Sequence, residues 1–267
     1  MRLFAICAIA FLAALAAQAE NRKTLNDRAA AHIASGTAPA AVRSMLGTST
    51  GGARAGRHAG VAATPHIELL ATHYGWWVAT RKYGGATVTS TNRVALSSWA
   101  ATHGFTATEI AEAGIGDVTI SFVSGIIPDG CIPYFAPTGT LDARFGRAGG
   151  VAGWLSNQNQ DTSLNVLPLT FTSDWHHWTD ATDYQTAAPE AVRADIRAAA
   201  AGRTYHDVHS GDSGHPVVID LGGNRLVLCS FCTSAAHGPD LTNPVTIRIL
   251  QAAAASVGDS LKVWDGR

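Results

Sequence analysis

The stretch HSGDSGHPVV, residues 209–218, holds one serine, Ser213, directly after Asp212 and between Gly211 and Gly214. Glycine adopts the backbone conformations of tight turns without the steric cost that a Cβ brings. One interpretation is therefore a tight turn that only glycine can make. The other is a nucleophilic serine whose neighbouring backbone amides point at a developing oxyanion. The rest of the chain decides between the two.

A nucleophilic serine needs a base and an acid. A histidine takes the proton of the hydroxyl, and a carboxylate holds the histidine ring in place. Asp117 stands at the start of an alternating apolar run, DVTISFV, and is the candidate acid. Two histidines compete for the role of base: His73, in ELLATHYG, and His103, in SSWAATHG.

These segments, taken in order, give the chain a family resemblance. GDSGHP at 211–216 resembles the Gly-Asp-Ser-Gly-Gly-Pro turn of the trypsin-like serine proteases of the chymotrypsin fold, with His215 in place of a glycine. GDVTISFV at 116–123 resembles the strand that carries their acid, and GVAATPHIELLATH at 60–73 resembles the segment that ends in their histidine. The resemblance extends from residue 59 to residue 267, and the layout is most similar to bacterial secreted members.

The spacing of the three residues separates the two histidines. His73 lies 44 residues before Asp117, and Asp117 lies 96 before Ser213. In the chymotrypsin order the corresponding gaps are roughly 45 and 93 residues. His103 lies only 14 residues before Asp117, which leaves too little chain for the intervening strands. We therefore expect His73 to be the base and His103 to pack and form hydrogen bonds.

The resemblance implies a role for each residue of the site. His73 would act as general base and then as general acid, Asp117 would orient it, and Ser213 would be the nucleophile. The backbone amides of Gly211 and Ser213 would form the oxyanion hole. No metal ion or organic cofactor is expected.

Four further residues are expected to bind the substrate. Asp207 lies six residues before Ser213, where relatives that cut after Lys or Arg keep an acid, so a preference for basic residues is expected. The alternative is an acid that pairs with Arg203 or is exposed in a loop. Ser230, Phe231 and Cys232 stand where the family has the Ser-Trp-Gly wall of its specificity pocket, and Cys232 in place of glycine is expected to narrow that pocket.

Short apolar runs bounded by Gly, Pro, Asn and Asp are typical of an all-β protein. The resemblance makes this expectation specific: two six-stranded antiparallel β-barrels with a C-terminal helix. Helices are expected at 189–201, which opens with proline, and at 243–257, which ends before Gly258. Expected strands include ATVTST, VALSSWA, DVTISFV, NVLPLTF, HPVVIDL and RLVLCSF.

The start of the chain is typical of an exported protein. Residues 1–19 combine Arg2, an apolar stretch and a small-residue Ala-Gln-Ala site, so we expect a signal peptide and a secreted or periplasmic protein. Residues 20–58, rich in Ala, Gly, Ser and Arg, are expected to be an N-terminal extension or a propeptide. Residues 59–267 then form the protease domain.

Composition excludes several other classes of function. With 19 Lys and Arg against 20 Asp and Glu, the chain lacks the excess of positive charge that is typical of proteins that bind nucleic acid. It also has no basic amphipathic segment of the kind that binds a membrane surface.

Beyond the expected signal peptide three cysteines remain, Cys131, Cys229 and Cys232, so at most one disulfide is expected. The cluster DWHHW at 174–178 lacks a third ligand at zinc spacing and is interpreted as a surface aromatic loop.

The sequence thus predicts a secreted, monomeric serine endopeptidase acting on protein or peptide substrates. Two alternatives stay open. One is an esterase that uses the same three residues. The other, of a different class, is a catalytically inactive, protease-like binding module.

Overall fold

The computed structural model describes the residues 44–50, 58–73, 79–145, 213–231 and 238–267, with isolated positions at 24, 25, 27, 28, 31 and 41. For residues 58 and 59 and for the strands at 151–157, 165–171 and 178–179 it describes the backbone alone. The expected signal peptide and the expected helix at 189–201 lie outside the described residues.

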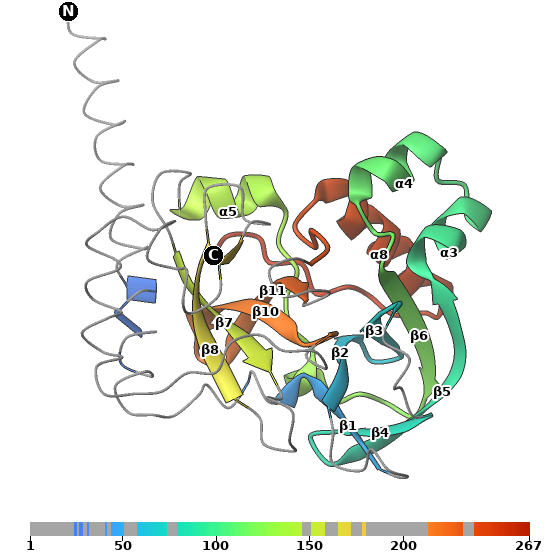
Figure 1. Ribbon diagram of the computed structural model, residues 1–267, viewed down its shortest axis with the longest axis horizontal. Helices are drawn as coiled ribbons and strands as arrows, with labels where there is room; N and C mark the ends of the chain where they lie inside the picture. Colours follow the sequence, from blue (N-terminus) through green and yellow to red (C-terminus); the bar gives the residue numbers. More distant parts are fainter. Residues whose placement is uncertain are drawn as a thin grey trace, which may run out of the picture.

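Six antiparallel strands close into a barrel, in the order β1-β2-β3-β6-β5-β4. This confirms one of the two barrels that the sequence predicts, and it is compatible with a chymotrypsin-like fold. Figure 1 shows the barrel beside a second, separate sheet. The barrel strands are β1 (Leu46–Ser49), β2 (His58–Thr64), β3 (Ile67–Ala71), β4 (Thr80–Tyr83), β5 (Ala86–Ala95) and β6 (Val118–Ser124).

The second sheet differs from the expected six-stranded barrel. Its five antiparallel strands run in the order β11-β10-β7-β8-β9, and within the described residues the sheet is open. Residues 180–212, which connect β9 to β10, lie outside the described part of the chain. The strands are β7 (Val151–Asn157), β8 (Asn165–Phe171), β9 (Trp178–Thr179), β10 (Pro216–Gly222) and β11 (Arg225–Phe231).

The C-terminal helix is confirmed as α8 (Pro244–Ser256). Asn243 caps its start, because the side chain accepts a hydrogen bond from the Val245 amide, and proline occupies the first turn. Gly258, with a φ of 78°, follows its end as expected. The apolar face of the helix, including Ile249 and Leu250, is buried in the main core.

One expected strand, VALSSWA at 94–100, is a strand only in its first two residues. The run VALSSWA leaves β5 at Ala95 and continues as α3 (Leu96–Thr102). The buried residues Leu96, Trp99 and Ala100 are spaced three and four apart, which places them on one face of a helix. Two more helices, α4 (Ala107–Ala113) and α5 (Thr138–Phe145), and the 3-10 turn η2 (Asp129–Cys131) were not expected.

The barrel takes its first strand from the range 20–58, the expected extension or propeptide. Strand β1 pairs with β2 and with β4 and so closes the barrel. The expected boundary at residue 59 falls inside β2. Upstream of β1, Leu25, Ala41 and Met45 are buried in the main core. Removal of the whole range would therefore open the barrel and expose part of its core.

A buried ion pair links β3 to β4 inside the barrel. Arg81 Nε lies 2.5 Å from Glu68 Oε2, and both side chains are completely inaccessible to solvent. The Tyr83 hydroxyl donates to the same oxygen at 2.7 Å. Burial, followed by the charge of Glu68, raises the pKa of Tyr83 well above its ordinary value, so the phenol stays a neutral donor.

A Cβ on Gly47 would lie 2.7 Å from the Tyr83 hydroxyl, so the residue at this position of β1 must be glycine.

Glu68→Gln should destabilise the protein strongly, because it leaves the Arg81 charge buried without its carboxylate. Breaking a buried pair in this way costs about 3–5 kcal/mol. The measurement is the free energy of unfolding from urea denaturation. Lys82→Gln, at an exposed position of β4 next to Arg81, is the control and should change that free energy by less than about 0.5 kcal/mol. Equal effects of the two substitutions would show that the pair contributes nothing specific.

Within the described part of the chain, no helix has the length and the apolar character needed to cross a membrane.

Candidate active site

His73 and Asp117 meet because β3 and β6 are paired. The register places Ala71 opposite Val118, so the residue after the end of β3 lies beside the residue before the start of β6. The Thr72 amide donates to the Asp117 carbonyl at 2.9 Å and extends the pairing by one step. The 43 residues between His73 and Asp117 therefore include β4, β5, α3 and α4, and the chain returns to the same edge of the barrel.

The Asp117 carboxylate makes two hydrogen bonds to His73. Oδ1 accepts from the His73 backbone amide at 3.0 Å, and Oδ2 lies 2.6 Å from Nδ1 of the imidazole. Two bonds to one residue fix both the backbone and the ring of the histidine. The exposed fractions of the two side chains are 48% for His73 and 38% for Asp117, so the pair lies open to solvent and to a substrate.

Ser213 reaches the same histidine from the second sheet. It stands in the turn that leads into β10, and its Oγ lies 2.8 Å from Nε2 of His73. The three side chains thus form one hydrogen-bonded series from carboxylate to imidazole to hydroxyl. With Nδ1 held by the carboxylate, Nε2 is left as the acceptor for the hydroxyl proton.

A close approach of two backbones brings the serine turn to the barrel. Gly214 has a φ of +87°, and a Cβ on it would lie 3.4 Å from the Gly60 nitrogen and 3.7 Å from the Ala71 nitrogen. Gly60 also has a positive φ, of +80°, and a Cβ there would lie 2.6 Å from Leu70 Cδ2. In Figure 1 the start of β10 reaches β2 and β3 at this point. A Cβ at Gly214 would make ordinary van der Waals contacts with the barrel, so the positive φ is what favours glycine in this turn, whereas at Gly60 the space is taken by Leu70.

The competing histidine, His103, is held against the end of α3. Its ring stacks on Trp99 with the centroids 3.9 Å apart, and Nδ1 lies 2.7 Å from the Trp99 carbonyl. It follows directly after the last residue of α3. These contacts give His103 the packing role that the spacing predicts.

Of the expected substrate-binding residues, the structure describes Ser230 and Phe231 at the end of β11. Phe231 lies opposite Pro216 and Ser230 opposite Val217, so the end of β11 runs beside the strand that leaves the Ser213 turn. Both side chains are fully buried, and the Ser230 hydroxyl donates to the Pro239 carbonyl at 2.7 Å. Gly211, Asp207 and Cys232 lie outside the described residues.

The two described cysteines are unpaired. Cys131 and Cys229 are both buried, and burial raises the pKa of the Cys229 thiol, so it stays protonated.

Residues 174–177 of the DWHHW cluster fall outside the described ranges. Among the residues that are described, no three His, Cys, Asp or Glu side chains gather as metal ligands would.

Compared with known proteins, the chain matches no family model and no curated protein sequence.

His73→Ala should abolish most esterase activity, since it removes the only group within reach of both Asp117 and Ser213 among the described side chains. Loss of a residue of such a series typically costs about 10⁴-fold or more in turnover. The measurement is hydrolysis of a p-nitrophenyl ester. His103→Ala is the matched control and should keep turnover within about twofold once folding is checked. A larger loss in His103→Ala than in His73→Ala would make His103 the base.

Proposed function

We propose that this protein is a serine endopeptidase that cleaves peptide bonds through an acyl-enzyme. The observation that carries the proposal is the position of His73, with Nδ1 2.6 Å from Asp117 and Nε2 2.8 Å from Ser213. A hydroxyl, a base and an orienting carboxylate in this order are what nucleophilic catalysis by serine requires. The proposal includes two further points. The five-stranded sheet is part of a second β-barrel, and the protein is exported.

The first half of the reaction forms the acyl-enzyme. Ser213 Oγ attacks the carbonyl carbon of the scissile bond while its proton passes to Nε2 of His73. Asp117 stabilises the imidazolium that results, because its carboxylate lies against Nδ1–H. The backbone amides of Gly211 and Ser213 donate to the oxyanion of the tetrahedral intermediate. His73 then returns the proton to the leaving amine, and the C–N bond breaks.

The second half repeats these steps with water. His73 takes a proton from the water, the hydroxide attacks the acyl carbon, and the proton returns to Ser213 Oγ as the acid leaves. The proposed substrate is a protein or peptide, with Asp207 at the base of the specificity pocket favouring Lys or Arg. Ser230, Phe231 and Cys232 would form one wall of that pocket.

Ser213→Ala tests the proposal most simply. The change removes one oxygen from a surface turn, so circular dichroism should show an unchanged fold. The rate of hydrolysis of a mixed peptide library, followed by mass spectrometry, should fall to a small fraction of the wild-type rate, since the oxyanion hole alone gives little catalysis. A Ser213→Ala protein that still cleaves peptides would place the chemistry at another residue.

The wild-type protein separates the alternatives in the same assays. Hydrolysis of esters without any cleavage of peptides would replace the endopeptidase with an esterase that uses the same residues. A folded wild-type protein that hydrolyses neither would favour the inactive binding module.

A further inference from the structure

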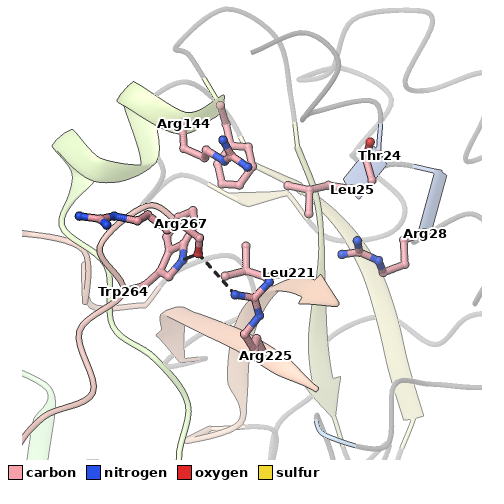
Figure 2. Close-up of a pocket in the computed structure, with 9 residues that line it drawn as sticks. Thr24, Leu25, Arg28, Arg144, Leu221, Arg225, Trp264 and Arg267 are labelled. Atoms are coloured by element: carbon pink, nitrogen blue, oxygen red, sulfur yellow. Dashed lines mark hydrogen bonds between the residues drawn. The ribbon is translucent and has the colours of Figure 1, made fainter. Parts of the chain in front are cut away.

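A small pocket on the second half of the molecule brings together four segments that are distant in sequence. It encloses about 110 Å³ and lies between the start of the described chain, the end of α5, the β10–β11 hairpin and the C-terminal segment. Figure 2 shows the side chains around it. The lining residues are Thr24, Leu25, Arg28, Arg144, Phe145, Leu221, Arg225, Trp264 and Arg267.

Among the described residues that line the pocket, four are arginines and none is acidic. This concentration is unusual for a chain whose net charge is −1. In Figure 2 the guanidinium groups of Arg28, Arg144 and Arg225 lie around the same opening, whereas the Arg267 side chain extends away from it. Arg267 instead lies 3.4 Å from Asp265. Three cations thus face one small space, an arrangement whose mutual repulsion a bound anion would relieve.

Backbone carbonyls hold two of these cations in place. Arg28 Nη1 donates to the Asp220 carbonyl at 2.8 Å, and Arg225 Nη1 donates to the Arg267 carbonyl at 3.4 Å. Trp264 Nε1 donates to the same Arg267 carbonyl at 2.8 Å and fixes its position. The Asp220 carbonyl orients the Arg28 guanidinium without neutralising it, and each of the two arginine bonds uses one of the five N–H donors of that side chain.

The floor of the pocket is apolar. Leu25, Phe145 and Trp264 are buried there, and the rings of Phe145 and Trp264 stack with their centroids 5.8 Å apart. An apolar floor lowers the local dielectric constant, so it strengthens the attraction between the arginines and an anion above it.

We propose that this pocket binds a phosphate group. A phosphate carries up to two negative charges and presents several acceptor oxygens, so it can accept from guanidinium groups on more than one side. A single carboxylate offers two oxygens and one charge, which suits one arginine rather than three. The volume admits one such group, and the apolar floor offers contact to an organic body attached to it.

A bound phosphate would join segments that the chain connects only at long range. Arg28 precedes the barrel, Arg144 lies in the last turn of α5, and Arg225 begins β11. The ligand would therefore hold the N-terminal segment against the second sheet. This site is separate from His73 and Ser213, and the proposal is independent of the proposed peptidase activity.

The test is calorimetric titration of the full chain with inorganic phosphate and, separately, with phenyl phosphate at low ionic strength. We expect saturable binding with one site per chain for at least one of the two ligands. Tighter binding of phenyl phosphate would identify an organic phosphate ester as the ligand, and equal or tighter binding of inorganic phosphate would identify the free anion. Absence of saturable binding of both ligands would overturn the proposal.

Charge-matched variants locate the site. Arg225→Gln and Arg28→Gln should each weaken binding at least tenfold, whereas Lys82→Gln, which removes one exposed positive charge from the barrel, should leave it within twofold. Arg144→Gln, on an exposed position of α5, gives the same test if either of the first two variants fails to fold. A loss in Lys82→Gln equal to that in the arginine variants would mean general charge attraction and would also overturn the proposal.

Discussion

The whole site depends on the close approach of two backbones at Gly214 and Gly60. The barrel supplies His73 and Asp117 from the paired ends of β3 and β6, while the second sheet supplies Ser213 from the turn before β10. A side chain at Gly214 would require a strained backbone at φ +87°, and its Cβ would lie 3.4 Å from the Gly60 nitrogen. Gly214, which follows Ser213, thus serves the site through its positive φ, which shapes the turn that meets the barrel.

The three residues of the proposed triad could be predicted from sequence because each carries a local signal and their order is distinctive. The α8 helix was predictable for a similar reason, since Asn243, Pro244 and Gly258 mark its ends. The α3 helix was predicted wrongly, although the spacing of Leu96, Trp99 and Ala100 was a helical signal. The α4 helix also had a readable signal that was missed, the capping box of Thr106 and Glu109.

The role of β1 in the barrel could not be read from LGTS alone. That strand closes the barrel because Gly47 fits against Tyr83 and because Glu68, Arg81 and Tyr83 form one buried polar cluster. Such contacts join residues that are distant in the sequence, and no local propensity encodes them. The same holds for the arginine-lined pocket, whose walls come from four separate segments.

The most direct test of the central claim is the rate and the site of phosphonylation by a fluorophosphonate, followed by peptide mass mapping of the full chain. The account predicts a single adduct, on Ser213, and a lower rate in Gly214→Ala, where a side chain at φ +87° strains the turn that holds Ser213 beside His73. Gly223→Ala, at a hairpin glycine whose added Cβ would meet no other atom within 4 Å, controls for the loss of a positive-φ glycine. An adduct on another residue, or an undiminished rate in Gly214→Ala, would contradict the account.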